Sequence, residues 1–205
     1  MHTIIFLGGA AFRLPDAARE ELAQSADLVI AADRGFENAA ANGFSPDLLV
    51  GDMDSIAAIP AGVDVIRIPR IKDDTDTQHA IGVALGRGAD RITLAGQLSG
   101  RADHTLSALL MLENLRLRGV AAEMIDDRNR VRAVKDERVV LPRRGYRYFG
   151  VISLGETEYS ARGCFYGADR VTLRRAEPYA ISNEITASAA ELEFAGDTAF
   201  LVESN

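Results

Sequence analysis

Acidic and other polar side chains gather at four places in the sequence, three directly after a short apolar run and one after a short Pro-Arg-Ile connection that follows such a run. These places are Asp33, the segment 51–55 with Asp52 and Asp54, the segment 72–76 with Asp76, and the segment 96–104 with Arg101 and Asp103. If the apolar runs are parallel strands, their carboxyl ends meet at one edge of a sheet, which is where open α/β sheets bind ligands. The four places are then expected to line a single crevice.

Crowded carboxylates in that crevice require an explanation. Two carboxylates about 4 Å apart repel by roughly 1 kcal/mol in water and by about 4 kcal/mol at an effective dielectric constant near 20. Such acids point apart into solvent, share a proton or surround a cation. Mg²⁺ prefers oxygen ligands, and because it keeps waters and binds substrate phosphates, two or three carboxylates are enough. The candidate Mg²⁺ ligands are Asp52, Asp54 and Asp76.

The same residues also have simpler interpretations. Thr75 and Gln78 have the spacing of a helix capping box, and Asp103 has the residue type of a helix N-cap. Asp52 and Asp54 are compatible with two turn acids, or with the nucleophile loop of haloacid-dehalogenase-type phosphohydrolases. The sequence contains no phosphate loop of the G-x-x-x-x-G-K-[ST] type, which disfavours a P-loop mechanism.

The first two thirds of the chain alternate apolar runs with helical patterns, which is typical of βαβ units and a mostly parallel sheet. The predicted strands are 3–7, 28–32, 48–51, 63–68, 91–95 and 122–125, and the predicted helices are 15–24, 35–41, 75–85 and 103–118. The helix from Asp103 is apolar almost all round, which predicts burial on more than one side. His2 and His79 are interpreted as surface or packing residues.

From about Arg128 onward the pattern changes to short strands separated by turn residues. Runs at 138–141, 148–154, 170–173, 190–194 and 199–202 are examples. This spacing predicts a small antiparallel sandwich or barrel. The expected fold is therefore α/β, with a doubly wound, mostly parallel sheet covered by helices on both faces in residues 1–127 and an all-β domain in residues 128–205.

Composition excludes several classes of protein. The formal net charge of −7 argues against non-specific binding of nucleic acid or anionic lipid. The single cysteine, Cys164, excludes an intramolecular disulfide framework and is interpreted as a buried small residue in a reducing compartment. The apolar residues 4–7 are interpreted as a core strand rather than as part of a signal peptide. No run reaches the 18 apolar residues of a membrane span. The expected location is the cytoplasm.

Taken together, the segments resemble the thiamine pyrophosphokinase family. The family's Ala-Asp-Gly-Gly, Pro-Asp-x-x-x-Gly-Asp-x-Asp-Ser-Ile, Lys-Asp-x-Thr-Asp and Gly-Gly-Arg-x-Asp-His segments are matched in order by 32–35, 46–56, 72–76 and 99–104. Ile181 to Glu184 is similar to the family's Ser-Asn-Glu segment in the β domain. Two departures are Arg34 and Ser99, which stand where the family has glycine, and the chain has no tryptophan to stack on thiamine.

The resemblance implies transfer of the diphosphate of ATP to the hydroxyl of thiamine, giving thiamine diphosphate and AMP. Positioning and cationic stabilisation supply most of such catalysis. Mg²⁺ is expected on the three aspartates, and Arg101 is the expected phosphate clamp because its guanidinium matches phosphate oxygens. Asp103 is expected to orient Arg101 or to accept the hydroxyl proton.

Further binding roles complete the expected site. Gly100 and the helix beginning at Asp103 offer an anion-binding terminus, and the residues expected to contact nucleotide or acceptor are Asp33, Asp52, Thr75, Gln97, Gly100, His104, Ser182 and Asn183. By the resemblance, Ser182 and Asn183 bind the thiamine ring across a homodimer interface. No nucleic-acid or membrane partner is expected.

Three alternatives remain open from the sequence. One is a diphosphokinase for another hydroxymethyl heterocycle, such as a pterin. A second is a metal-dependent phosphohydrolase with Asp52 as nucleophile. The third is a catalytically silent sensor of nucleotide or thiamine, which would bind ligand without forming AMP.

Overall fold

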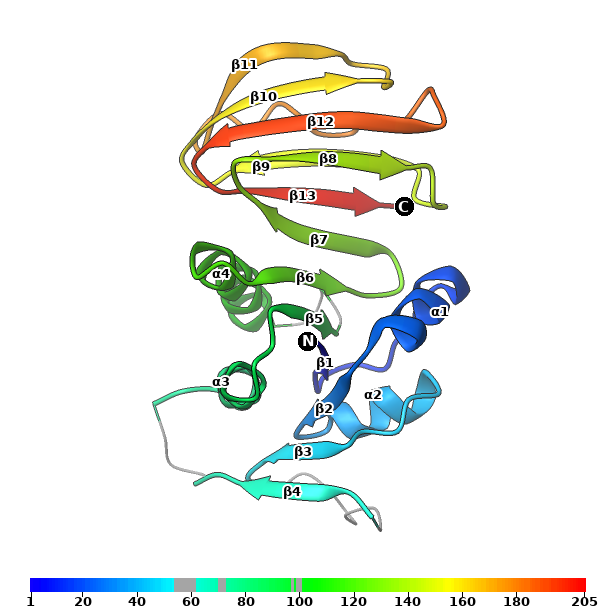
Figure 1. Cartoon of the computed structure of the whole chain (residues 1–205), viewed down its shortest axis with the longest axis vertical. Helices are drawn as coiled ribbons and strands as arrows, with labels where there is room; N and C mark the ends of the chain where they lie inside the picture. Colours follow the sequence, from blue (N-terminus) through cyan, green and yellow to red (C-terminus); the bar gives the residue numbers. More distant parts are fainter. Residues whose placement is uncertain (54–61, 70–72, 97, 99–100) are drawn as a thin grey trace. The chain divides into compact units, whose positions relative to one another are not determined.

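The computed structural model describes residues 1–53, 62–69, 73–96, 98 and 101–205. Its N-terminal part is built on a parallel sheet with strand order β4-β3-β2-β1-β5-β6 (Figure 1). The strands are β1 (His2–Phe6), β2 (Leu28–Ala32), β3 (Leu48–Gly51), β4 (Asp64–Arg67), β5 (Arg91–Ala95) and β6 (Ala121–Ile125). The order reverses between β1 and β5, so the topological switch point lies between these two strands.

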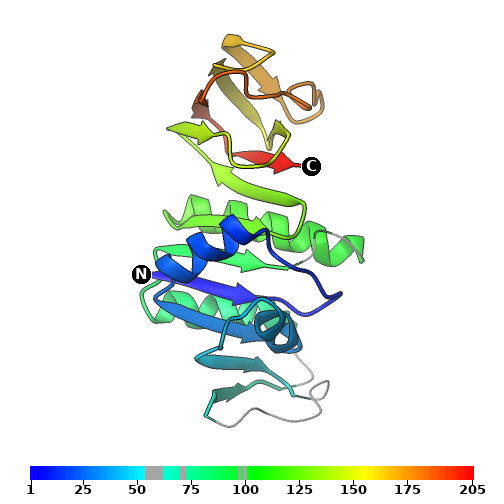
Figure 2. The same cartoon turned by 90° about the vertical axis from the view of Figure 1, so that its right-hand side faces the viewer.

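Helices lie on both faces of this sheet (Figures 1 and 2). They are α1 (Asp16–Ser25), α2 (Gly35–Ala41), α3 (Asp76–Gly86) and α4 (Ala102–Leu117). Helices α1 and α2 cover one face, and α3 covers the opposite face (Figure 1). Among the described residues, no helix has both the length and the hydropathy needed to cross a bilayer.

The strand sequences explain why the sheet lies inside. Every residue of β1, β2 and β3 is buried, as expected for parallel strands covered on both faces. Ile4, Phe6 and Val29 pack with Leu22 of α1 and Ala39 of α2 in one apolar cluster. The strand β4 stands at the edge of the sheet with residues that are only partly buried or exposed, and it is one residue shorter at each end than the predicted 63–68.

The prediction that α4 is buried on more than one side is wrong. Leu112 and Leu115 are fully buried, but Leu106, Leu110 and Leu117 are 60%, 55% and 60% exposed. The exposed leucines follow one another at helical spacing and therefore share one face of α4. Apolar composition predicted the helix but not which side of it is covered.

Residues 128–205 form a β-sandwich. One antiparallel sheet has the order β7-β13-β9 and the other has the order β11-β10-β12-β8. The strands are β7 (Asn129–Val134), β8 (Glu137–Pro142), β9 (Tyr148–Ser153), β10 (Glu156–Arg162), β11 (Ala168–Arg174), β12 (Ala189–Gly196) and β13 (Ala199–Ser204). Their inward side chains, including Leu141, Val151, Leu192 and Leu201, form a separate apolar core. The predicted fold class is confirmed.

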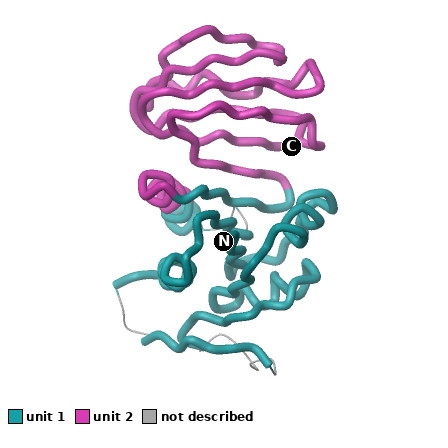
Figure 3. The backbone as a smooth tube through the Cα atoms, viewed as in Figure 1, with its two compact units in different colours: residues 1–108, 120–127 teal, residues 109–119, 128–205 magenta. Residues whose placement is uncertain are grey.

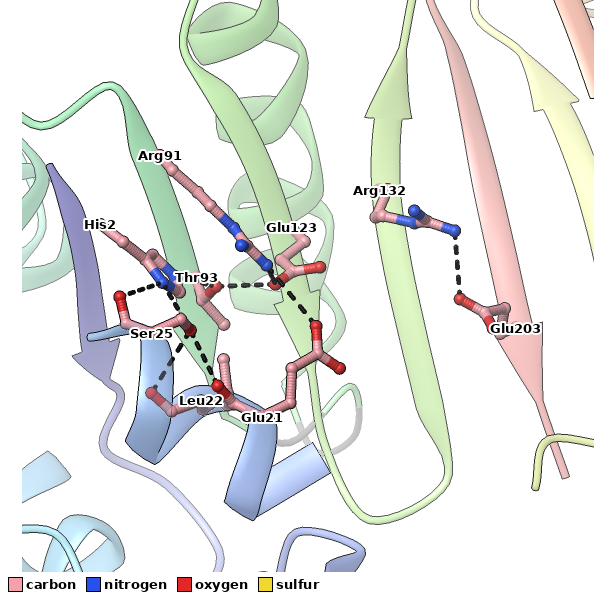
Figure 4. A network of polar contacts seen from close by, with 9 residues as sticks. All are labelled: His2, Glu21, Leu22, Ser25, Arg91, Thr93, Glu123, Arg132 and Glu203. Atoms are coloured by element: carbon pink, nitrogen blue, oxygen red, sulfur yellow. Dashed lines mark hydrogen bonds and ion pairs between the residues drawn. The ribbon is translucent and has the colours of Figure 1, made fainter. Parts of the chain in front are cut away.

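Two strands of this sandwich, β7 and β10, were not predicted from the sequence. In β10 only Thr157, Tyr159 and Ala161 are buried, and charged or polar residues alternate with them. In β7 the arginines hide the pattern, because Arg130 is buried and Arg132 lies 3.4 Å from the buried Glu203 of β13 (Figure 4). In β7, therefore, some of the buried positions hold charged side chains in ion pairs, where other strands hold apolar residues.

By the density of internal contacts the chain divides into two compact units (Figure 3). Unit 1 comprises residues 1–108 and 120–127, and unit 2 comprises residues 109–119 and 128–205. The assignment of catalysis to residues 1–127 and of acceptor binding to residues 128–205 stays a prediction.

A glycine at the start of α2 allows the helix to approach β1. A Cβ atom at Gly35 would overlap the carbonyl group of Phe6, the last residue of β1. The neighbouring Arg34 has an ordinary helical conformation, with φ −62°, and its side chain forms an ion pair with Glu37. The departure at position 34 is therefore compatible with the fold, whereas position 35 requires glycine.

We expect Gly35→Ala to lower the free energy of unfolding by about 3 kcal/mol or more, because backbone atoms must move to admit the methyl group. Gly82→Ala is the matched control: Gly82 lies in α3 with open space around it, and alanine there should stabilise by roughly 0.5–1 kcal/mol. Urea denaturation of both variants measures the difference. Equal effects would show that the close approach of α2 to β1 is not a constraint.

A buried polar network lies at the opposite edge of the sheet from the strand carboxyl ends (Figure 4). The Oγ1 of Thr93 donates to Glu123 at 2.8 Å and lies 2.9 Å from Nε2 of His2, so Nε2 is the donor to Thr93. Arg91 approaches Glu123 at 3.3 Å, and the hydroxyl of Ser25 lies 3.1 Å from Nδ1 of His2. The prediction that His2 is a packing residue is confirmed.

Burial lowers the pKa of the His2 imidazole below its ordinary value of 6.5, and Arg91 lowers it further. Glu123, the Ser25 backbone and Asp27 oppose this shift without cancelling it. Because the folded state favours neutral His2, its contribution to stability is complete above pH 6.5 and decreases as pH falls toward the lowered pKa.

We therefore expect the stability advantage of the wild type over His2→Gln to shrink when the pH is lowered from 7.5 to 5.5. Denaturant titrations at several pH values measure this difference. The exposed His104 supplies a control, because His104→Gln leaves the buried network around His2 intact. An advantage that is constant over the whole range would contradict a neutral, buried His2.

Candidate active site

The predicted site residues of unit 1 that the structure describes all follow the carboxyl end of a strand. Asp33 follows β2 and Asp52 follows β3. Thr75 and Asp76 lie at the start of α3 after β4, and Arg101, Asp103 and His104 lie at the start of α4 after β5. Because the strands are parallel, these positions share one edge of the sheet. Asp54, Gln97 and Gly100 were also predicted, and they lie outside the described residues.

Asp33 and the end of β3 are in close contact. The backbone N–H of Asp33 donates to the carbonyl of Val50 at 2.8 Å, and Asp33 has a left-handed backbone with φ 48°. A Cβ atom at Gly51 would lie 3.3 Å from the Cβ of Asp33, so the two backbone segments approach closely here. Asp33 and Asp52 are both half-buried. The local backbone thus holds the first two acidic positions side by side.

Helix α3 begins with the predicted capping box. Thr75 Oγ1 accepts the N–H of Gln78 at 3.2 Å, and the Gln78 side chain accepts the N–H of Thr75 at 2.8 Å. The simpler interpretation of this segment is therefore confirmed. The helix packs against β1, β2 and β3. Its N-terminus, with the half-buried Asp76, lies at the carboxyl edge, where the partial positive charge of a helix end favours anions.

Arg101 and Asp103 form an exposed, bidentate ion pair. Nε and Nη2 of Arg101 donate to the two carboxylate oxygens of Asp103 at 3.2 Å and 2.6 Å. The hydrogen bonds from Arg101 lower the pKa of the Asp103 carboxyl. Asp103 lies inside the first turn of α4, so the N-cap interpretation is wrong. The contact by which Asp103 was expected to orient Arg101 is present, and His104 beside it is exposed.

Asp126 was missed by the sequence analysis. It follows β6 directly, its side chain is 3% exposed, and its carboxylate accepts the N–H of Leu98 at 2.9 Å. It therefore holds the backbone of Leu98, three residues before Arg101. The sequence contains a signal that could have identified it, because Asp126, like Asp33 and Asp52, is an acidic residue directly after an apolar run.

Two buried asparagines, Asn38 in α2 and Asn42 directly after it, hold the loop that follows β1. Asn38 donates to the carbonyl of Leu7 at 2.9 Å, and Asn42 accepts the N–H of Leu14 at 2.7 Å and donates to the carbonyl of Phe12 at 3.2 Å. Both side chains are at most 3% exposed. An asparagine in or just after a short helix is usually exposed, so the sequence gives no signal for this buried role.

Ser182 and Asn183 belong to unit 2. Asn183 is buried, and its amide accepts the N–H of Tyr166 at 3.0 Å and donates to the carbonyl of Tyr166 at 2.8 Å. Ser182 is exposed and has a left-handed backbone with φ 57°. Nearby Cys164 is only partly buried, so its interpretation as a buried residue is wrong.

The donor types at the edge fit a hard cation. Asp52 and Asp76 offer carboxylate oxygens, which are suitable ligands for Mg²⁺. In the described part of the chain, however, no group of at least three His, Cys, Asp or Glu side chains is arranged to hold a metal ion. The third predicted ligand, Asp54, lies outside that part. The described pair fits the ion in chemistry, and substrate phosphates would have to complete the coordination.

Comparison with known proteins identifies the family. Residues 19–123 match the family model described as thiamin pyrophosphokinase, catalytic domain. The chain belongs to the thiamin pyrophosphokinase family. Family membership makes it a pyrophosphokinase. None of the curated proteins compared with the chain matches it.

Solved structures of thiamin pyrophosphokinases are similar over the whole chain. The enzyme from Bacillus subtilis is 25% identical with a TM-score of 0.86, and the match covers 100% of this chain and 99% of that one. The enzyme from Geobacillus thermodenitrificans is 25% identical with a TM-score of 0.82, covering 100% and 98%. The Candida albicans enzyme, 16% identical with a TM-score of 0.77 over 100% and 89%, shares the fold.

For Asp126 we expect Asp126→Ala to lower the free energy of unfolding by roughly 1–3 kcal/mol, because it leaves the N–H of Leu98 without its acceptor. The KM for ATP should rise as well, since the loop leading to Arg101 loses an anchor. Asp126→Asn retains one acceptor oxygen and should lie between the wild type and Asp126→Ala. Denaturant titration and steady-state kinetics measure both effects, and an Asp126→Ala enzyme with unchanged stability and KM would remove Asp126 from this role.

Proposed function

We propose that this pyrophosphokinase transfers the diphosphate of ATP to the hydroxyl of thiamine, giving thiamine diphosphate and AMP. The observation that supports this most directly is the common edge on which Asp33, Asp52, Asp76 and the Arg101–Asp103 pair follow successive strands. Their order along the chain is the order of the family's segments.

The residues at this edge have distinct proposed tasks. The acceptor hydroxyl attacks the β-phosphorus in line, and the α-phosphate leaves as AMP. Arg101 binds phosphate oxygens through its guanidinium, which the carboxylate of Asp103 holds in a fixed plane. The N-terminus of α3 and Thr75 contact phosphate, while Asp33 and Gln97 contact the nucleotide. Since both side chains of the Arg101–Asp103 pair are exposed, the guanidinium can reach a ligand.

We further propose that Asp52, Asp54 and Asp76 hold Mg²⁺. When bound, the ion would neutralise charge on the phosphate oxygens. The carboxylates would in turn be relieved of their mutual repulsion. Ser182 and Asn183 are proposed to serve the acceptor, at the interface of a homodimer. The cytoplasmic location stays a prediction.

The reaction is tested by incubating the protein with ATP, Mg²⁺ and a panel of alcohols, followed by identification of the nucleotide product. AMP formed only with thiamine is the expected result. AMP formed with a hydroxymethyl pterin would show that the acceptor is a pterin rather than thiamine. Release of inorganic phosphate without any alcohol would favour a phosphohydrolase with Asp52 as nucleophile, and tight binding without AMP would indicate a sensor.

The metal assignment predicts that Asp54→Asn lowers kcat by roughly 10²–10³-fold, the size of effect seen when one electrostatic contact to the transition state is lost. It should also weaken Mg²⁺ binding in calorimetry and leave the thermal stability of the metal-free protein equal or higher. Asp74→Asn is the matched control, because Asp74 is exposed and pairs with His79 at 2.8 Å. Equal Mg²⁺ affinities in Asp54→Asn and wild type would refute the assignment.

A further inference from the structure

Three arginines lie close together in the connection between β8 and β9. Arg143, Arg144 and Arg147 occur within five residues, and all three are exposed. The chain as a whole has a formal net charge of −7, so this segment is positive on an acidic protein. A guanidinium group binds phosphate or carboxylate oxygens through two parallel hydrogen bonds, so exposed arginines that share one segment attract anions.

A cavity of about 240 Å³ opens at this connection. It is lined by Arg143, Gly145, Tyr146 and Arg147 of the connection and by Glu184 and Ile185 of the segment before β12. Two arginines and one glutamate give the lining a formal charge of +1. The cavity therefore favours an anion.

Both arginines of the lining have N–H groups that a ligand can use. Within the part of the chain that the structure describes, the Arg143 guanidinium has no ion-pair or hydrogen-bond partner. Nη2 of Arg147 lies 4.0 Å from the carboxylate of Glu184, which is too long for a hydrogen bond. The guanidinium carbon of Arg147 lies 4.8 Å from the centroid of the Tyr148 ring, a cation–π contact that holds the group without using its N–H groups.

The backbone that carries the two arginines is fixed at both ends. The N–H of Arg143 donates to the carbonyl of Ser188 at 3.3 Å. The N–H of Arg147 donates to the side chain of Asn205 at 2.8 Å, so this end of the connection lies beside the C-terminus of the chain (Figure 1). Asn205 is held in turn, because its N–H donates to the carbonyl of Arg128 at 3.1 Å. Such anchoring reduces the entropy lost when a ligand binds.

We propose that this cavity binds the diphosphate group of a small organic molecule, and that Arg143 and Arg147 each contact its phosphate oxygens. A diphosphate offers oxygens to both guanidinium groups at once, whereas a single carboxylate occupies only one of them. Glu184 opposes the anion, and its weak contact with Arg147 is replaced when the ligand binds. The site goes beyond the proposed reaction, to which neither arginine was assigned.

The size of the cavity and the charge of the chain favour a small ligand over a nucleic acid. The cavity is smaller than the roughly 300–1,000 Å³ of typical small-molecule pockets, so it holds one group of a ligand while the rest lies outside. A polynucleotide is bound by an extended basic surface that contacts many phosphates. A chain with a net charge of −7 and a single short arginine segment at this site does not match that requirement.

The first experiment is calorimetric titration of the full chain with inorganic pyrophosphate in a buffer that contains EDTA. Without a divalent cation the acidic carboxyl edge of unit 1 repels the anion, so binding reports on the arginine cavity. Arg143→Gln and Arg147→Gln should each weaken binding by roughly tenfold or more, because each removes a charge-assisted contact. Arg138→Gln is the matched control, since Arg138 is also exposed in unit 2 but pairs with Glu193 at 2.7 Å outside the cavity. Absence of binding by the wild type, or equal affinity in both cavity variants, would overturn the proposal.

A variant with an expected gain of affinity makes the test independent of any loss of folding. Glu184→Gln removes the one negative charge of the lining and should tighten pyrophosphate binding by roughly two- to fivefold, the effect of one exposed charge pair. The same titration measures it. An unchanged or lower affinity would show that the anion does not lie beside Glu184.

Further titrations identify the ligand group and its place. Inorganic phosphate should bind more weakly than pyrophosphate, and equal affinities would contradict a clamp of two arginines. ADP and thiamine diphosphate should compete with pyrophosphate in the wild type, and failure of both would exclude an organic diphosphate. Arg101→Gln should bind pyrophosphate as the wild type does. If Arg101→Gln alone abolished binding, the anion would belong to the carboxyl edge and the proposal would be wrong.

Discussion

Repulsion between like charges at the carboxyl edge of the parallel sheet is the constraint on which the rest of the site depends. The loops after β2, β3 and β4 each bring an acidic residue to that edge, and Asp33 and Asp52 are held side by side by the close approach at Gly51. Such crowding lowers stability unless positive charge is supplied. In the described structure the N-terminus of α3 brings partial positive charge to Asp76, and Arg101 pairs with Asp103. A phosphate-bound cation is the natural complement.

The loops that hold these charges are anchored by buried polar groups rather than by apolar packing. Asn42 fixes the loop after β1, Asp126 accepts the N–H of Leu98, and Asn183 holds the backbone of Tyr166 between β10 and β11. Each buried side chain satisfies backbone groups that have no partner in a regular element. These anchors are buried, whereas Arg101, the proposed phosphate clamp, is exposed. The groups that hold the backbone are thus distinct from the side chain proposed to bind phosphate.

The accuracy of the sequence analysis followed the strength of the hydrophobic signal. Runs such as 28–32 and 91–95 were predicted with their observed boundaries, because central parallel strands are apolar throughout. The strand β7 was missed because its buried Arg130 interrupts the apolar pattern, and β10 was missed because two of its three buried residues, Thr157 and Ala161, are only weakly apolar. For α4 the apolar composition predicted more burial than the structure shows, because the sequence of a helix does not indicate which of its faces another element covers. The anchors at Asn42 and Asp126 depend on partners 28 residues away, which no local pattern contains.

By itself the sequence determined the alternation of strands and helices, the change to an all-β pattern after Arg128, and the acidic segments that lie at strand ends. Those features are local, because they follow from periodicity, from turn residues and from the parallel order of βαβ units. Only the tertiary structure decided which glycine is sterically required, which leucines of α4 face outward, and which side chains hold the loops. These depend on distances between segments far apart in the chain, and such distances are set by the packing of the whole fold.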